Sequence, residues 1–476
     1  MTTHTKVLLA SGVIAAFTIL STITAQQPRA VDAHFLKLAG TSKDTAPGTW
    51  VTNGLNQEET RYSLLKQIDA TNVGKLGLSW MTPIGKGGGN QEGTPLMWND
   101  TLYTVSNWSI VSAINARDGK VKWTYEPKMD EADVRRRMCC GQVNRGLAIA
   151  QGMVFVPVND GRLVALDALG GQVKWESRVS ELKDWYSLTI APRIAGDKVV
   201  IGVAGGDHPI RGFVDAYYIK DGKRAWRFWT VPGDPAKGFE DKAQEAAAKT
   251  WGPGKWWEWG GGGSVWDGLA YDADTNMVYA GTGNAEPWSE GFRGSKDKDN
   301  LYTCSIIAID ASSGKLKWHY QTVPNDQWDF DSVGGFVMAD ISIKGKTRKV
   351  IMQAPKSGVF YIVDRTNGEF ISAEPFVQIN WATGFDPKTG RAILNKDAFY
   401  NQTTQVTIYP GGGGAHNWAQ MSFNPMTGLV YLPKTAGSYN FRAAEEVTEA
   451  GGGHHGLAVG RGGAASFKTV TPQPIW

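Results

Sequence analysis

Short apolar stretches recur along the chain, each ending at an alanine, and each is followed by a glycine and then by a tryptophan. Residues 113–123 show the pattern, which returns at 165–175, 216–226 and 308–318 and, more loosely, at 70–80. In most copies an aspartate or asparagine stands two residues after the alanine. Alternating apolar and polar residues on both sides of a glycine turn predict two strands joined by a hairpin. The pattern therefore predicts a chain built from repeated antiparallel strands.

The spacing of the tryptophans indicates which repeat architecture the strands form. Trp80, Trp123, Trp175 and Trp226 follow one another at intervals of 43 to 52 residues, and the 92 residues up to Trp318 leave room for an unmarked copy. Periods of roughly 40–50 residues are typical of propeller blades. A large ring at a fixed repeat position is interpreted as structural, locking one blade to its neighbour. We therefore expect an all-β propeller rather than a sandwich.

Two long stretches interrupt the repeat. Residues 232–259 contain an alanine-rich segment, 244–249, which predicts a short helix. Residues 443–463 are rich in glycine and predict a mobile loop. Neither stretch is needed to explain a function.

Composition excludes several classes of protein. The 49 basic and 46 acidic residues are spread along the chain, without the basic cluster that nucleic-acid binding requires. No Gly-x-Gly-x-x-Gly motif stands between a predicted strand and a predicted helix, where a nicotinamide-binding domain would have it. The seven histidines show no metal-ligand spacing, and no Cys-x-x-Cys-His motif for a c-type haem occurs.

The first 25 residues have the order of a secretory signal peptide. A lysine precedes an apolar run at 7–20, and small residues at 24–25 offer a cleavage site after Ala25. The run is shorter than the roughly 20 residues that a membrane span needs. We therefore expect a periplasmic protein, residues 26–476, with no stable membrane span after the signal is removed.

Cys139 and Cys140 are adjacent, so a disulfide between them would close almost no loop and would be strained. Two interpretations remain open from the residues alone. The pair is either two reduced thiols packed as small apolar groups or, in an oxidising compartment, a rigid eight-membered ring. Cys304, alone in a strand-like segment, is expected to be a buried core residue.

Seven motifs in matching order resemble the pyrroloquinoline quinone (PQQ) alcohol dehydrogenases, relatives of methanol and ethanol dehydrogenase. The resemblance runs from about residue 38 to the end of the chain. The motifs are Gln91-Glu92-Gly93-Thr94-Pro95, Cys139-Cys140 with Asn144-Arg145-Gly146, Leu188-Thr189 to Pro192, Gly205-Gly206-Asp207 with Arg211-Gly212, Gly281 to Asn284 with Pro287-Trp288, Trp328-Asp329-Phe330-Asp331, and Gln353 to Lys356.

The resemblance implies an eight-bladed β-propeller with quinone and metal near its axis. It also leads us to expect further strands after Trp476, so the propeller is expected to be incomplete at its C-terminal end. In the family, a vicinal disulfide covers one face of the quinone and a tryptophan covers the other. These walls correspond here to Cys139–Cys140, now interpreted as oxidised, and to Trp266.

The resemblance also assigns the polar contacts of the cofactor. Arg145 would bind cofactor oxygens through its fork of donors, and Lys356 would donate to the quinone oxygens. The remaining positions carried over as cofactor contacts or pocket lining are Glu92, Thr189, Gly205, Gly206, Asn417 and Trp418.

A metal site of oxygen donors follows from the same resemblance, with Asp207, Asn284, Asp329 and Asp331 as ligands. Oxygen donors select a hard cation. If residues 329–331 are a strand, both aspartates face the same side, and the added charge favours a lanthanide(III), with Ca²⁺ as the alternative. Asp207 departs from the family pattern, which has glutamate there.

Asp329 is the predicted catalytic base, taking the alcohol proton while hydride passes to the quinone. The resemblance thus implies oxidation of primary alcohols to aldehydes, with electrons leaving to a cytochrome c or a similar acceptor. A sugar or polyol quinoprotein dehydrogenase and a propeller scaffold without cofactor are the alternatives. A homo-oligomer stays open.

Overall fold

The computed structural model describes residues 30–138, 140–445, 457–459 and 466–467. The predicted signal peptide, Cys139 and most of the glycine-rich stretch 443–463 therefore lie outside the described residues. Among those described, no helix has the length and apolar character needed to cross a bilayer.

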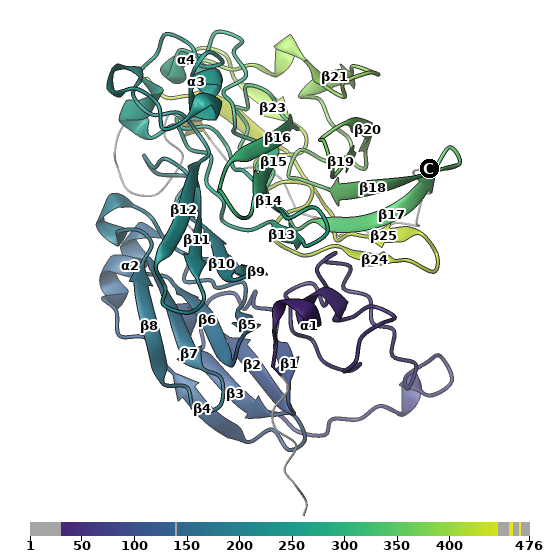
Figure 1. The fold of residues 1–476 in the computed structure, drawn as a ribbon. Coiled ribbons are helices and arrows are strands. Elements are labelled where there is room, and N and C mark those ends of the chain that lie inside the picture. The colour runs from purple at the N-terminus through teal and green to yellow at the C-terminus, as the bar shows by residue number, and fades with distance from the viewer. Residues whose placement is uncertain (1–29, 139, 446–456, 460–465, 468–476) are drawn as a thin grey trace, which may run out of the picture.

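Five four-stranded antiparallel sheets follow one another along the chain and around the molecule (Figure 1). The first two comprise β1 (Leu96–Trp98), β2 (Thr101–Val105), β3 (Val111–Asn115), β4 (Val121–Tyr125), and β5 (Ala148–Ala150), β6 (Met153–Val158), β7 (Arg162–Asp167), β8 (Val173–Arg178). The third comprises β9 (Arg193–Ala195), β10 (Lys198–Gly202), β11 (Phe213–Tyr218) and β12 (Arg224–Trp229). The last two comprise β13 (Leu269–Asp272), β14 (Met277–Gly281), β15 (Ser305–Asp310), β16 (Leu316–Gln321), and β17 (Val337–Ile343), β18 (Lys346–Gln353), β19 (Val359–Asp364), β20 (Phe370–Pro375).

Shorter strands and helices complete the described chain. The strands are β21 (Ala382–Phe385), β22 (Ala392–Leu394), β23 (Val406–Ile408), β24 (Ser422–Asn424), β25 (Leu429–Tyr431), β26 (Thr435–Ala436), β27 (Tyr439–Ala443), β28 (Leu457–Val459) and β29 (Ser466–Phe467). The helices are α1 (Ala33–Leu38), α2 (Glu131–Arg137), α3 (Lys242–Ala248) and α4 (Glu290–Arg293). Six 3-10 turns are Val73–Lys75, Asn107–Ser109, Leu182–Asp184, Pro235–Lys237, Trp256–Trp259 and Lys396–Ala398. The predicted all-β propeller is confirmed, and α3 confirms the helix expected near 244–249, whereas the number of eight blades stays a prediction.

The repeated tryptophans dock each sheet onto the next unit of the chain, as the sequence predicted. The indole N–H of Trp123 on β4 donates to the carbonyl of Ala168, and that of Trp175 on β8 donates to Ile219, at 3.2 and 2.8 Å. Trp80 makes the same bond to Ala116, at 3.1 Å, although no strand forms around it. The rings lie against the glycine turns of the following unit, so ring and glycine act as one joint.

The joint leaves no space for a side chain at the glycine. We expect Gly171→Ala to destabilise the protein, because a Cβ there would lie 2.7 Å from two atoms of the Trp123 ring. The matched control is Gly152→Ala, since Gly152 has the same φ of +75° but no atom within 4 Å of its Cβ position. In thermal unfolding, the free energy of unfolding of Gly171→Ala should be about 1–3 kcal/mol lower than that of Gly152→Ala, because only the first variant overpacks. Equal melting temperatures would contradict the joint.

One expectation about the repeat is corrected, and one further docking contact is found. The 92-residue interval before Trp318 contains no unmarked sheet among the described residues, because loops and α3 fill the gap between β12 and β13 and α4 lies between β14 and β15. The fifth sheet docks through Phe370 on β20 instead of a tryptophan. Its ring lies within 2.2–2.3 Å of the position that a Cβ at Gly390 would take.

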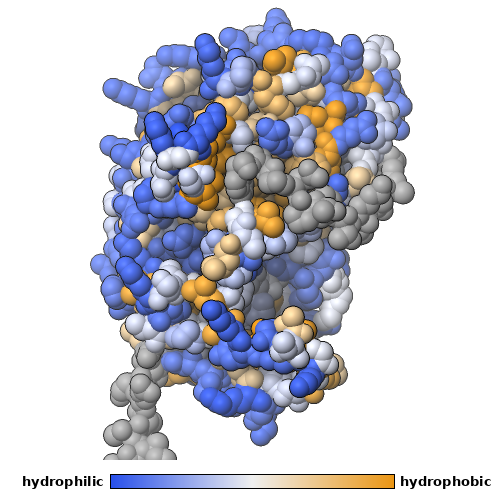
Figure 2. Space-filling view, turned by 90° about the vertical axis from the view of Figure 1, so that its right-hand side faces the viewer, coloured by the Kyte–Doolittle hydropathy of each residue, from blue (hydrophilic) through white to orange (hydrophobic). Residues whose placement is uncertain are grey.

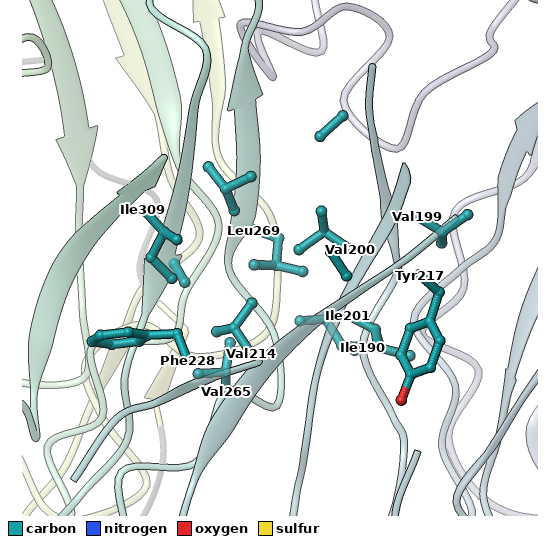
Figure 3. Packing of buried hydrophobic residues seen from close by; sticks show 14 of the residues in the cluster. Ile190, Val199, Val200, Ile201, Val214, Tyr217, Phe228, Val265, Leu269 and Ile309 are labelled. Atoms are coloured by element: carbon teal, nitrogen blue, oxygen red, sulfur yellow. The ribbon is translucent and has the colours of Figure 1, made fainter. Parts of the chain in front are cut away.

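The core consists of apolar side chains packed between neighbouring sheets. The largest cluster joins β5–β15, and Figure 3 shows its side chains, from β10, β11, β13 and β15 among others, gathered between strands. Cys304 is completely buried immediately before β15, which confirms its expected place in the core. On the face drawn in Figure 2, hydrophobic residues form small groups among hydrophilic ones rather than one continuous area.

Candidate functional site

The predicted site residues come from loops at one end of the sheets. Glu92, Arg145 and Trp266 precede the first strands β1, β5 and β13, whereas Asn284 and Lys356 follow the second strands β14 and β18. In an antiparallel pair, the start of one strand and the end of the next lie at the same end of the sheet. The blade topology therefore gathers segments that are far apart in sequence.

These loops surround one cavity of about 270 Å³. It brings together the predicted residues Glu92, Cys140, Arg145, Thr189, Gly205, Gly206, Asp207, Trp266, Asn284, Asp331, Lys356, Asn417 and Trp418. Cys139 is outside the described residues, so its disulfide with Cys140 stays a prediction. Asp329 is not part of the wall but reaches it through Lys356.

Arg145 holds three segments together at the cavity wall. Its guanidinium forms an ion pair with Glu92 at 2.9 Å and donates to Thr189 Oγ1 at 2.8 Å and to the backbone carbonyl of Trp266 at 3.1 Å. It also lies over the Trp266 ring, 4.6 Å from the centroid. The planar fork of arginine suits such multiple contacts. The Trp266 ring forms a flat wall, with Arg145 and Lys356 as cations beside it.

Burial makes the acidic partners of Arg145 costly to ionise. It raises the pKa of Glu92, and Arg145 opposes this shift while Asp267 adds to it. Asp267, which sequence analysis missed, is 4.0 Å from Arg145, and burial also raises its pKa. Its only signal in the sequence was its position next to Trp266. Arg145 thus favours the charged form of both carboxyl groups, against the effect of their burial.

Lys356 is held between the two aspartates of the Trp-Asp-Phe-Asp motif. Its ammonium nitrogen lies 2.9 Å from Asp329 and 2.6 Å from Asp331. Burial alone would lower the pKa of Lys356, but Asp329 and then Asp331 outweigh it and raise that pKa. Burial raises the pKa of Asp329 well above its ordinary value, against the opposing effect of Lys356. A further cation nearby would favour the charged form of Asp329.

The expected strand at 329–331 is wrong, although its consequence holds in part. No strand includes these residues, and Asp329 adopts a left-handed backbone with φ of 64°. Side-chain alternation therefore does not align the aspartates. They converge because both contact Lys356, and because the Asn284 N–H and the Trp266 indole N–H fix Asp331 at 2.8 and 3.2 Å.

The loop 205–207 approaches Asn284 so closely that it needs glycine. A Cβ at Gly206 would lie 2.6 Å from Ser264 Oγ and 3.1 Å from Asn284 Oδ1. Gly205 has a φ of +122°, and a Cβ there would lie 2.5 Å from the Trp185 carbonyl oxygen. These two glycines therefore set how near Asp207 comes to the cavity.

Asn417, Trp418 and Cys140 contribute to the rest of the lining. Trp418 is 37% exposed, in contrast to the buried side chains of Arg145 and Asp331. The Asn417 amide is fixed by the Gly413 carbonyl, to which it donates at 2.9 Å. These contacts place the 417–418 turn at the open side of the cavity.

Glu286 is a second residue that sequence analysis missed. It is 1% exposed and accepts a hydrogen bond from Asn284 Nδ2 at 3.3 Å. Burial, and then the charge of Asp207, raise its pKa well above the ordinary value. An acidic residue two positions after Asn284 was the available signal, but nothing in the sequence marked it as buried.

The donor set agrees with a hard cation and with an anionic planar cofactor. Asp207, Asn284, Asp329 and Asp331 offer oxygen atoms alone, and the mutual effects of Asp207, Glu286 and Asp329 on pKa indicate excess negative charge. Arg145 and Lys356 offer cations beside the Trp266 ring. The described residues contain no group of three or more His, Cys, Asp or Glu side chains close enough to form a metal cage.

Fold and site together define a β-propeller protein whose loops enclose a cavity with a flat aromatic wall, two cations and several carboxyl groups. Residues 50–377 match the family model of the glucose/ethanol/alcohol dehydrogenase β-propeller domain, called PQQ. The chain belongs to this family, and the resemblance noted in the sequence is confirmed.

Individual relatives agree with this membership. The quinohemoprotein alcohol dehydrogenase of Comamonas testosteroni is 46% identical over 428 residues, which cover 89% of this chain and 60% of that protein. The solved structure of quinohemoprotein alcohol dehydrogenase ADHIIG from Pseudomonas putida HK5 matches with a TM-score of 0.85 and 42% identity, covering 89% of this chain and 61% of that one. A europium-containing methanol dehydrogenase matches with a TM-score of 0.80 and 32% identity, covering 87% and 73%. The chain thus spans about three fifths of the length of the first two relatives.

Proposed function

We propose that this chain forms the catalytic propeller of a PQQ-dependent dehydrogenase that oxidises primary alcohols to aldehydes. The observation that carries the proposal is the convergence of Asp329 and Asp331 on Lys356 beside the cavity wall of Arg145 and Trp266. A cavity with cations and a flat wall, and a base beside it, are what a planar, anionic quinone and an alcohol require. The relatives named as alcohol dehydrogenases support the same reaction.

Each residue of the cavity has a proposed role in binding the cofactor. When bound, PQQ supplies the acceptor for the two electrons of the alcohol. Trp266 would cover one face of the planar ring and the Cys139–Cys140 disulfide the other, while Arg145 and Lys356 bind its oxygens. Glu92, Thr189, Gly205, Gly206, Asn417 and Trp418 would complete the pocket.

Asp329 is the group proposed to accept the hydroxyl proton of the alcohol. Its side chain keeps 14% exposure and lies against Lys356, which lines the cavity. Lys356 donates to one carboxylate oxygen and stabilises the charged form that a base needs. The other oxygen is the one proposed to accept the proton.

Asp207, Asn284, Asp329 and Asp331 are proposed to hold one metal ion, a lanthanide(III) in preference to Ca²⁺. The buried carboxylate Asp331 adds charge to an all-oxygen site, which favours the ion of higher charge. The europium-containing structural relative supports this preference. The ion would stabilise negative charge on the cofactor during the reaction.

Location and partners follow from the same class. The signal peptide would direct export to the periplasm and then be removed, which leaves a single propeller domain from residue 26 onward. This domain would pass its electrons to a cytochrome c or a similar acceptor. A homo-oligomer is compatible with this assignment, and no nucleic acid takes part.

Reconstitution tests the proposal. The purified protein is incubated with PQQ and either La³⁺ or Ca²⁺, and dye-linked oxidation is measured with primary alcohols, glucose and polyols. We expect alcohol oxidation that is faster with La³⁺. Equal rates with both ions would refute the lanthanide preference, whereas faster oxidation of glucose or polyols would favour the sugar dehydrogenase.

The scaffold alternative has its own outcome in this experiment. If PQQ does not co-elute with the protein in the presence of either ion, the cavity is not a quinone site. The chain would then be a propeller that serves as a binding scaffold.

A further inference from the structure

A third cation lines the cavity besides Arg145 and Lys356. It is Arg137, the last residue of α2, and its side chain keeps 13% exposure. Arg145 and Lys356 are paired with Glu92 and Asp331, which line the same cavity. Arg137, by contrast, forms no ion pair with any described acidic residue of the cavity wall.

The carboxylate partner of Arg137 lies outside the cavity wall and is shared. Asp133, four residues earlier on α2, accepts from Arg137 Nε at 2.8 Å and from Arg136 Nη2 at 2.6 Å, both on the oxygen Oδ1. One carboxylate therefore faces two arginines, which leaves one positive charge in excess among these three residues. Arg136 is 62% exposed and is not part of the cavity wall, whereas Arg137 is.

The guanidinium of Arg137 is held in one orientation. Besides the bond to Asp133, its Nη1 donates to the carbonyl of Lys183 at 2.8 Å, and its carbon Cζ lies 4.9 Å from the centroid of the Trp185 ring. A guanidinium has five N–H groups, and these hydrogen bonds use two of them. The others donate to no residue that the structure describes, on a side chain that lines the cavity.

We propose that Arg137 is an anion-binding residue of the cavity and that it binds a carboxylate of the ligand. Carboxylate is the class of group that fits, because a guanidinium presents parallel N–H donors to its two oxygens. Such a carboxylate has two sources, namely the quinone cofactor, which carries carboxylates, and an alcohol substrate with an acid group. The inference rests on the proposed function, because it names a contact of the same cavity.

The first source is tested without turnover, by equilibrium dialysis of the protein against PQQ in the presence of La³⁺. Arg137→Gln removes the charge and the fork of donors, so we expect the dissociation constant of PQQ to rise about tenfold or more. Arg137→Lys keeps the charge but cannot stack flat on Trp185, so a smaller rise is expected. An equal rise in both variants would assign the effect to lost packing and would overturn the inference.

The matched control is Arg136→Gln, because Arg136 shares Asp133 with Arg137 but stays out of the cavity wall. Its affinity for PQQ should equal that of the unaltered protein. An equal loss in both glutamine variants would assign the effect to the shared carboxylate and would overturn the inference. If melting curves show that Arg137→Gln does not fold, Arg137→Lys is compared with Arg136→Lys, and equal affinities of these two would also overturn it.

The second source is tested at saturating PQQ with 3-hydroxypropanoate and 1-propanol, two primary alcohols that differ by an acid group. If the substrate supplies the carboxylate, Arg137→Gln should leave the PQQ affinity unchanged and raise KM about tenfold or more for the acid alone. If neither the PQQ affinity nor the ratio of the two KM values changes, Arg137 is not an anion-binding residue. If the unaltered protein binds no PQQ, the proposed function itself fails, which distinguishes that outcome from failure of the Arg137 inference.

Discussion

Replacement of Asp329 by asparagine should abolish alcohol turnover while the quinone stays bound. The amide cannot take a proton from the substrate, but its carbonyl oxygen can still accept from Lys356, as Asp329 does at 2.9 Å. A general base contributes about 10²–10⁴-fold to a rate, and a loss in that range is expected. Dye-linked turnover and the amount of PQQ retained after gel filtration are the two measurements.

Asp340→Asn is the control for this variant. Asp340 is 46% exposed and pairs with Arg365 and Lys349 far from the cavity. The turnover rate of Asp340→Asn should therefore match that of the unaltered protein. Turnover retained in Asp329→Asn would rule out Asp329 as the base. Loss of PQQ from that variant would instead assign Asp329 a role in holding the site together.

The second large effect is expected at Arg145. Arg145→Met leaves the buried carboxyl group of Glu92 without its ion-pair partner, and breaking a buried pair in this way costs about 3–5 kcal/mol. The variant should unfold faster and retain no PQQ. Because large proteins often unfold irreversibly, the half-life at elevated temperature is the suitable measure of stability. Arg145→Lys should keep most of the stability but bind PQQ less well, since it lacks the planar fork.

The stability lost in Arg145→Met should increase with pH. Burial already raises the pKa of Glu92, and removal of Arg145 raises it further. A neutral carboxyl group tolerates burial better, so Arg145→Met should be less destabilising at about pH 5 than at about pH 8. Arg117→Met is the control, because its exposed pair with Asp100 contributes only about 0–1 kcal/mol. Equal half-lives for the two variants at both pH values would contradict the role of Arg145.

The repeat of the blades could be predicted because it depends on local and periodic signals. Each tryptophan ring packs against the glycine turn of the following unit, and both residue types recur at a fixed spacing in the sequence. Phe370 performs the same docking without a tryptophan, so a search based on that residue type missed it. Loop length, rather than a hidden blade, explains the long interval before Trp318.

The residues of the site were predictable from their motifs, whereas their geometry was not. Arg145, Trp266 and Lys356 were placed in one pocket by resemblance, and the cavity confirms that they meet. The left-handed backbone of Asp329 depends on tertiary contacts, which alternation rules do not contain. Glu286 was missed because burial, not residue type, makes it unusual.

The cavity wall extends from Asn90 to Trp418, so segments from most of the described chain meet around a single small volume. A ligand bound there would contact loops that are far apart in the sequence and hold them together. Ligand at one hundred times its dissociation constant adds about 2.7 kcal/mol to the stability of the folded form. If the quinone is that ligand, loss of the cofactor would remove this stabilisation of the fold as well as the activity.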